Sequence, residues 1–195
     1  MVPPELVPLE HSFRLILNKS LMVAVELGIA DHLEAGPQTA EELALVVGAN
    51  PDALDRLLGF LFSAGLLGRA RDGRYRNNAV SNTLRKNHPG SPRDWVLFAG
   101  SDWLWDAWNQ LGHSVRTGES GMVKAHGVPF FDYLNSTNPA AGTAFTRALA
   151  FFSRLQAPIV AAKYDFSPIH RLCDVGVRKR HPPRRGSQRL PQRQR

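Results

Sequence analysis

The side chains that most often carry chemistry are few in this sequence, and they do not gather into a catalytic or metal-binding pattern. Seven histidines are scattered along the chain, and none forms the pair four residues apart, with a carboxylate partner, that a helical zinc site needs. We therefore expect them at surface or loop positions. The single cysteine, Cys173, excludes an internal disulfide and a multi-cysteine metal site. The sequence predicts no metal centre.

A short apolar run over residues 169–176 is typical of a β-strand that ends in a tight turn at Asp174 and Gly176. From Gly176 onward there are eight basic residues and no acidic ones, which leaves 16 basic against 17 acidic residues in the rest of the chain. The net charge of +7 therefore comes from this segment alone. A segment so polar cannot bury enough apolar surface to order itself, so we expect a disordered basic tail over 177–195.

The composition is that of a globular protein, with 43% hydrophobic and 21% charged residues in a chain of 195. This length suits one domain or slightly more. The longest apolar run, Leu21–Val25, is far shorter than the roughly 20 residues that span a bilayer. The first residues lack the positive charge and apolar stretch of a secretory signal. We expect a cytoplasmic protein with no membrane partner.

Three helices are predicted in the first third of the chain. Apolar residues on more than one side predict a helix over 12–35 that is buried on two faces. Thr39, followed by two glutamates, is typical of the start of a short helix over 40–47. Asn50, followed by proline, begins a third helix with leucines at the spacing of one face.

A β-hairpin is predicted after the third helix. Asp72-Gly73 is a strong turn signal between two short strands, 65–69 and 74–76. Helix, turn, helix and hairpin in this order predict a winged helix-turn-helix within residues 1–90.

The next segment, 91–168, is expected to be a helical connector, with loops at 118–121 and 127–129 and a long helix over 140–162. The fold class predicted for the whole chain is therefore mainly α. The start of the connector is rich in aromatic residues: Trp95, Phe98, Trp103, Trp105 and Trp108.

Many winged helices bind DNA, and the predicted hairpin carries Arg69, Arg71, Arg74 and Arg76. The helix that would read the bases, however, begins with two aspartates, whose charges repel phosphate. The same helix is apolar in nearly every direction, which favours burial. The sequence thus favours dimerisation, with no specific nucleic-acid partner, and a DNA-binding regulator stays as the alternative. We expect the basic tail to bind polyanions only non-specifically.

Five stretches resemble, in order and spacing, the N-terminal half of the S-adenosylmethionine-dependent O-methyltransferases that act on plant phenolics and bacterial polyketides or antibiotics. The resemblance runs from Phe13 to Gly176. It implies a winged-helix dimerisation domain, a helical connector and the first strand of a Rossmann-like methyltransferase domain. It also implies a homodimer through the N-terminal helices, a small-molecule acceptor and S-adenosylmethionine as cofactor. The stretches are LNKSLMVAVELGIADHL, GLLGRARDGRYRNNAVSNTL, WNQLGHSVRTGESG, HGVPFFDYLNSTNPAAGTAFTRALAFFS and DFSPIHRLCDVG.

The resemblance assigns site residues as well. Asp174 and Gly176 match the turn that contacts the cofactor, and Ser153 on the long helix falls on the same side. Aromatic and apolar residues at helical spacing are also typical of a core, so that role stays open for each acceptor residue. The family's catalytic histidine follows the first strand, so no catalytic residue is assigned here. The residues that match the acceptor pocket are Trp108, Phe145, Leu149 and Phe152.

The family's D-x-G-x-G-x-G turn breaks off after Gly176. Residues 177–180, VRKR, replace the remaining glycines with side chains that cannot stand where only glycine fits. One permitted codon choice for residues 178–187 is CGG AAG CGG CAC CCT CCT CGC CGC GGG TCG. Shifted by one base, it encodes Gly-Ser-Gly-Thr-Leu-Leu-Ala-Ala-Gly, which is the missing turn in the expected place. We hypothesise a frameshifted, truncated O-methyltransferase that is inactive alone.

Overall fold

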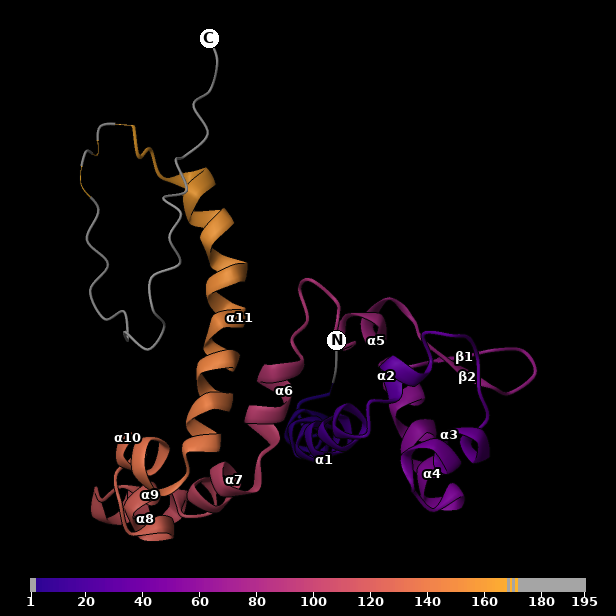
Figure 1. The fold of residues 1–195 in the computed structure, drawn as a ribbon. Helices are drawn as coiled ribbons and strands as arrows, with labels where there is room; N and C mark the ends of the chain where they lie inside the picture. Colours follow the sequence, from indigo (N-terminus) through magenta and orange to yellow (C-terminus); the bar gives the residue numbers. More distant parts are fainter. Residues whose placement is uncertain (1–2, 168, 170, 172–195) are drawn as a thin grey trace.

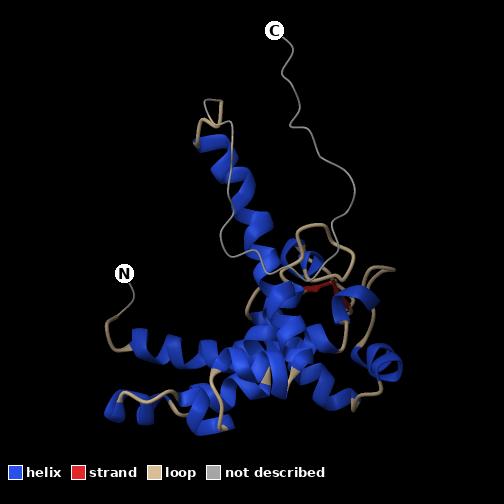
Figure 2. Cartoon of the chain, turned by 60° about the vertical axis from the view of Figure 1, so that its left-hand side comes forward, coloured by secondary structure: helices blue, strands red, loops and turns tan. Residues whose placement is uncertain are grey.

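The computed structural model describes residues 3–167, 169 and 171 (Figure 1). The basic tail, and all but two residues of the predicted strand over 169–176, therefore lie outside the described residues, Asp174 and Gly176 among them. Helices dominate the described part, and its strands form one short hairpin (Figure 2). This confirms the predicted mainly α fold class.

The described elements follow one another in two groups, an N-terminal winged-helix part and a C-terminal helical part. In chain order they are α1 (Leu6–Glu26), α2 (Ile29–His32), α3 (Ala40–Val47), α4 (Pro51–Ser63), β1 (Gly68–Arg69), β2 (Tyr75–Arg76), α5 (Ala79–Thr83), α6 (Arg93–Gly100), α7 (Asp102–Trp108), α8 (Leu111–Thr117), α9 (Gly121–His126), α10 (Phe130–Asp132), the π-helical segment η1 (Tyr133–Thr137) and α11 (Pro139–Lys163).

The helix predicted over 12–35 is wrong at both ends. It begins at Leu6 and ends at Glu26, and a separate short helix, α2, follows. The break is at Gly28, whose φ of +66° is a left-handed conformation that glycine adopts without steric cost. Because the chain turns there, Ile29 packs into the winged-helix core rather than continuing the line of α1.

Burial on two sides is confirmed for the second half of α1. Ala24 belongs to the core that α1 shares with α2, α3 and α4. Met22 and Val25 belong to a second core with Leu84 and with Val96 of α6. The wide apolar face thus serves two neighbours, and α1 lies between the two groups of elements (Figure 1).

The helix-turn-helix pair α3 and α4 begins as the sequence predicts. Thr39 Oγ1 accepts from the Glu42 N–H at 3.2 Å, and the Glu42 carboxylate accepts from the Thr39 N–H at 2.8 Å. This reciprocal capping box satisfies two backbone donors that the helix leaves free. Asn50 Oδ1 accepts from the Ala53 N–H at 3.0 Å and caps α4. Local capping chemistry therefore fixes both starts.

The hairpin is shorter than predicted. Gly68 pairs with Arg76 and Arg69 with Tyr75, in antiparallel register. The predicted first strand over 65–69 fails at its start because Gly65, with φ +73°, ends α4 instead.

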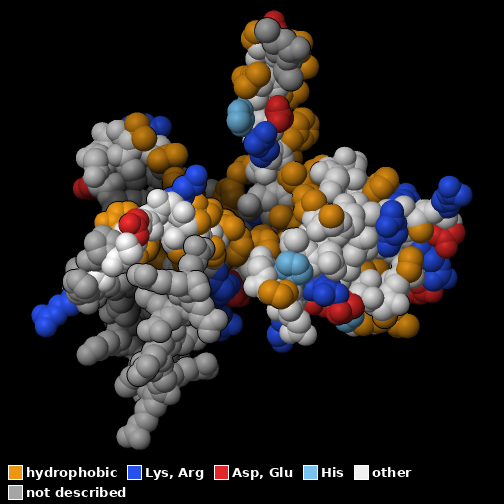
Figure 3. Space-filling model, turned by 90° about the horizontal axis from the view of Figure 1, so that it is seen from above, with side chains coloured by type: hydrophobic (Ala, Val, Ile, Leu, Met, Phe, Trp, Pro, Cys, Tyr) orange, Lys and Arg blue, Asp and Glu red, His pale blue; other side chains and the backbone are white. Residues whose placement is uncertain are grey.

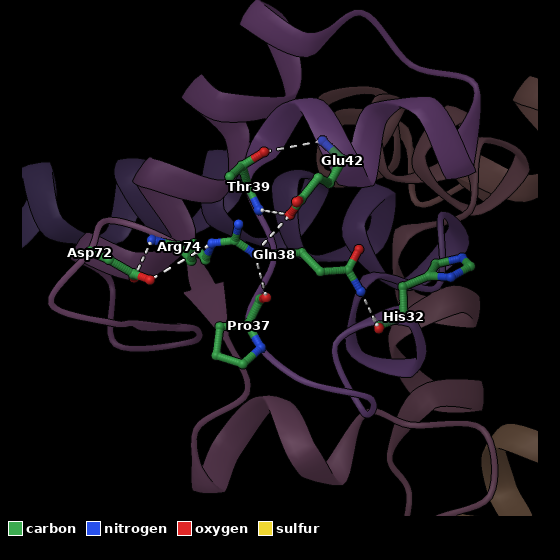
Figure 4. A network of polar contacts seen from close by, with 7 residues as sticks. All are labelled: His32, Pro37, Gln38, Thr39, Glu42, Asp72 and Arg74. Carbon is green, nitrogen blue, oxygen red and sulfur yellow. Dashed lines mark hydrogen bonds and ion pairs between the residues drawn. The ribbon is translucent and has the colours of Figure 1, made fainter.

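The arginines of the hairpin have partners within the same domain. The Arg74 guanidinium lies 3.3 Å from the Glu42 carboxylate and 3.7 Å from that of Asp72, and it also donates to the Pro37 carbonyl (Figure 4). Arg69 Nε donates to the Gly73 carbonyl at 2.9 Å. Basic and acidic side chains are interspersed over this end of the molecule (Figure 3). These contacts tie the hairpin to the start of α3.

Two helices extend beyond the packed body, and their outer parts expose apolar side chains (Figure 2). No helix among the described residues is both long and apolar enough to cross a membrane. The exposed set on α1 is Leu6, Val7, Leu9, Phe13, Leu15 and Ile16, and that on and just after α11 is Leu149, Leu155, Ile159, Val160 and Tyr164.

Tyr75 links the hairpin to α4 at the centre of the winged-helix core. Its side chain is 1% exposed, and its hydroxyl donates to the Asp55 carboxylate at 2.8 Å. The Arg69 guanidinium lies 5.1 Å from the ring centroid. Burial, with the hydrogen bond to Asp55, raises the pKa of Tyr75 to about 12.

We predict that Tyr75→Phe destabilises the fold at neutral pH and flattens its alkaline pH dependence. Asp55 loses a charge-assisted hydrogen bond, which costs about 1–2 kcal/mol at pH 7. In the wild type, the raised pKa means that the contribution is complete below about pH 10, where the unfolded tyrosine titrates, and is lost as the pH rises through 12. Urea unfolding followed by circular dichroism between pH 7 and 11 measures both effects.

The matched control is Tyr164→Phe, at a tyrosine that is 57% exposed. It should leave the neutral stability and the alkaline slope unchanged. Equal alkaline slopes for the wild type and Tyr75→Phe would contradict the assignment.

Candidate functional site

Seven aromatic side chains from α6, α7, α10, η1 and α11 form a continuous cluster, called here the aromatic cluster. Phe98 is its centre, with ring centroids 5.3 Å from Phe145, 5.6 Å from Trp95 and 5.8 Å from Trp103. Edge-to-face and tilted pairs at such distances are favourable beyond the area they bury. The members are Trp95, Phe98, Trp103, Phe130, Tyr133, Phe145 and Phe152.

A close contact between α11 and η1 positions the long helix against this cluster. Asn138 Oδ1 accepts from the Ala141 N–H at 3.0 Å and caps α11 directly after η1 ends. At Gly142 a Cβ would collide with the Leu134 carbonyl, so glycine is required for this approach. The resulting orientation directs Phe145 between Phe98 and Phe130.

Two of the four predicted acceptor residues lie in the aromatic cluster. Phe145 contacts Phe98 and Phe130, each with ring centroids at 5.3 Å, and Phe152 meets Trp95 edge to face at 4.7 Å. Both are half-buried. Leu149 lies between them on the same face of α11 and is 44% exposed. The face therefore combines two supported rings with one accessible aliphatic side chain.

Trp108 lies apart from this face. It is 58% exposed and lines an open hollow between α7, α8 and α9, beside Leu104, Leu111 and Met122. Phe130 borders both this hollow and the aromatic cluster. The structure thus brings Phe145, Leu149 and Phe152 together and leaves Trp108 on the other side of Phe130.

Sequence reasoning missed the contributions of Phe130, Tyr133 and His126. His126 is half-buried, its Nε2 lies 2.7 Å from the Trp103 carbonyl, and its ring lies 4.5 Å from that of Tyr133. The surface or loop position expected for every histidine is therefore wrong for His126. Because a carbonyl only accepts, Nε2 carries the proton. The density of rings in HGVPFFDYL was the available signal, but three short elements had to fold together before it became a cluster.

The cofactor side of the site is represented by one described residue. Ser153 is exposed on α11, and its hydroxyl donates to the Leu149 carbonyl of the same helix at 3.4 Å. A single hydroxyl turned toward its own helix does not hold a nucleoside or an amino acid. Asp174 and Gly176 lie outside the described residues. The described part therefore does not by itself form a site for S-adenosylmethionine.

The chemistry open to the described site is binding by shape and stacking. The aromatic cluster offers ring faces and edges, which suit a planar apolar molecule. No group of three or more histidine, cysteine or acidic side chains that could hold a metal lies within the described part of the chain.

Two family models match the chain. A model of the O-methyltransferase dimerisation domain matches residues 9–87, and one of the O-methyltransferase domain matches residues 108–178. This chain belongs to the O-methyltransferase family with an N-terminal dimerisation domain. The family predicted from the sequence is confirmed.

The relatives are bacterial enzymes of secondary metabolism. The mitomycin biosynthesis 6-O-methyltransferase of Streptomyces lavendulae is 39% identical over 160 residues, which cover 81% of this chain and 45% of that protein. The solved structure of LaPhzM has a TM-score of 0.79 at 33% identity, and the match covers 86% of this chain and 50% of that one. The chain spans about half the length of the curated relatives it matches.

Members of the family use S-adenosylmethionine. The O-methyltransferase NcsB1 from neocarzinostatin biosynthesis was solved with S-adenosylmethionine and 2-hydroxy-5-methyl naphthoic acid. It matches with a TM-score of 0.63 at 32% identity, over 77% of this chain and 46% of that one.

We predict that Phe145→Ala and Leu149→Ala, on the same face of α11, differ sharply in stability. Removing Phe145 leaves a cavity between two rings and should cost about 3 kcal/mol of unfolding free energy. Leu149→Ala removes an exposed side chain and should change it by less than about 0.5 kcal/mol. Urea unfolding of the full chain, followed by near-ultraviolet circular dichroism, measures both. Equal losses would show that α11 does not pack as described.

Proposed function

We propose that this chain is the dimerisation and acceptor-binding half of an S-adenosylmethionine-dependent O-methyltransferase that methylates a hydroxyl of a small aromatic metabolite. The observation that carries the proposal is the aromatic cluster at the junction of α6 and α11, because rings in this arrangement suit a planar acceptor. The relative solved with a hydroxynaphthoic acid supports an acceptor of the same chemical type.

The four acceptor residues have different roles in this proposal. Leu149 is the accessible side chain that touches the acceptor, and Phe145 and Phe152 support it from either side on α11. Trp108 contributes from α7, across Phe130. Ser153, one residue after Phe152, faces the cofactor.

The dimerisation domain suggests a homodimer, and we assign its interface to the first half of α1. Phe13 and Ile16 are 56% and 55% exposed in the single chain, with Leu9 at 53% one turn earlier. Such a continuous apolar face is unusual on an isolated protein and typical of an interface. The winged-helix part therefore serves assembly, and we expect no sequence-specific binding of DNA.

We predict a dimer at micromolar concentration by size-exclusion chromatography with light scattering. The double variant Phe13→Glu/Ile16→Glu places two charges in the apolar face and should yield monomers. The control is Leu45→Glu/Val46→Glu on α3, where both side chains are also exposed, and it should stay dimeric. A wild-type monomer, or equal dissociation of both variants, would overturn the assignment.

The cofactor turn is the second part of the proposal. Residues 177–180, VRKR, stand where the family has glycines, and the match to the O-methyltransferase domain extends to residue 178. A one-base shift restores a glycine-rich turn, so we attribute the basic tail to a frameshift. The divisions that follow are a dimerisation domain over 1–90, a connector over 91–168, a first strand over 169–176 and the tail. The location we expect is the cytoplasm.

We predict that the chain with VRKR at 177–180 does not bind S-adenosylmethionine, because branched and long side chains block the close approach of the cofactor to the turn. Sequencing the gene from codon 174 onward should show that the shifted frame continues. Isothermal titration of S-adenosylmethionine should give saturable binding for the restored-frame protein and none for the present chain. Saturable binding by the present chain would contradict the proposal.

A further inference from the structure

A hollow of about 420 Å³ lies between the loop over 84–92, the start of α6 and one side of α11. Its volume falls within the range of small-molecule pockets, about 300–1,000 Å³. We call it the cationic pocket because five of its lining residues are basic. Its lining is Lys86, His88, Ser91, Arg93, Asp94, Leu97, Arg147 and Arg154.

The basic side chains of the cationic pocket are poorly neutralised. Within the described part of the chain, the side chains of Lys86, Arg147 and Arg154 make no ion pair. Arg93 lies 3.7 Å from the Asp31 carboxylate, a single long contact. Asp94 is the acidic residue of the lining. The pocket therefore has an excess of positive charge, whereas Arg74 on the hairpin has two acidic neighbours.

The loop that forms one wall is held in place by its own hydrogen bonds. The Lys86 N–H donates to Asp31 Oδ1 at 2.7 Å, and the Arg93 N–H donates to Ser91 Oγ at 3.2 Å. His88 Nδ1 accepts from the Gly90 N–H at 3.3 Å, so the ring proton of a neutral imidazole is on Nε2. The donors are thus present on a fixed backbone.

The opposite wall comes from a different side of α11 than the acceptor residues. Arg147 and Arg154 are seven residues apart, about two turns, and so lie on one side of the helix. At 100° per residue, that side is well away from the Phe145 and Phe152 face. The cationic pocket is therefore separate from the aromatic cluster, and its function does not depend on the proposed methyl transfer.

We propose that the cationic pocket binds a small polyanion with two or more phosphate or carboxylate groups. Arginine guanidinium groups match such oxyanions in a bidentate geometry, and lysine adds a point charge. A hollow bordered by two arginines of α11 on one side and by Lys86 and Arg93 on the other has room for two anionic groups. A ligand with one charge would leave half of these cations unpaired.

The test is isothermal titration of the full chain with pyrophosphate, and with citrate in a second arm, at about 0.15 M salt to screen binding to exposed charges. We expect saturable binding at one ligand per chain. The double variant Arg147→Gln/Arg154→Gln should weaken it by about tenfold or more, and Lys86→Gln should weaken it by less. The arm with the tighter binding identifies phosphate or carboxylate as the preferred group.

The matched control is Arg56→Gln/Arg71→Gln, which removes the same charge at two exposed positions on α4 and the hairpin. It should change the affinity less than twofold, and thermal melting without ligand should be unchanged in both double variants. Equal weakening by both double variants would show binding to net charge or to the basic tail, and would overturn the proposal. So would unaltered affinity in Arg147→Gln/Arg154→Gln, or binding of a DNA duplex in place of both small anions.

Discussion

The arrangement of the described elements depends on the close approach of α1 and α6. A Cβ at Gly100 would lie 2.5 Å from Met22 Sδ and 2.7 Å from Met22 Cβ, so the crossing requires glycine there. Three residues before Met22, Lys19 Nζ donates to the Gly100 carbonyl at 2.8 Å and to the Asp102 carboxylate at 2.7 Å. A cation suits the C-terminus of α6, and Asp102 suits the start of α7. One lysine thus holds the ends of two connector helices against the dimerisation helix.

Because α6 has only eight residues, this crossing also determines where the site can form. Val96 packs with Met22 and Val25 of α1, while Phe98 is directed toward the rings of the connector. The same short helix therefore contributes to a core with α1 and to the aromatic cluster with α11. A shift of α1 would reach Phe145 through a single intervening helix, which couples the proposed dimer interface to the proposed acceptor wall.

Features set by neighbouring residues were predictable from the sequence, and features set by distant ones were not. The capping residues Thr39 and Asn50 fix the starts of α3 and α4 through bonds within one turn, so both starts were predicted correctly. Gly28 was read as part of a helix, because its left-handed φ is rewarded only once Ile29 reaches the core. Phe145 was identified by helical spacing and resemblance, whereas its partner Phe130 comes from a separate element that becomes its neighbour only in the folded chain.

The long helix α11 combines three surfaces that a single periodicity does not reveal. Its first half buries Ala141 and Ala148 and presents Phe145 to the rings, and its arginine side borders the cationic pocket. Its outer half exposes Leu155, Ile159 and Val160, each more than half accessible. A helix gains most of its stability from packing rather than from propensity, so the outer half depends on what covers it. In the family a methyltransferase domain follows this helix. If VRKR replaces the glycine turn of that domain, the loss would therefore affect the outer part of α11 as well as the cofactor site.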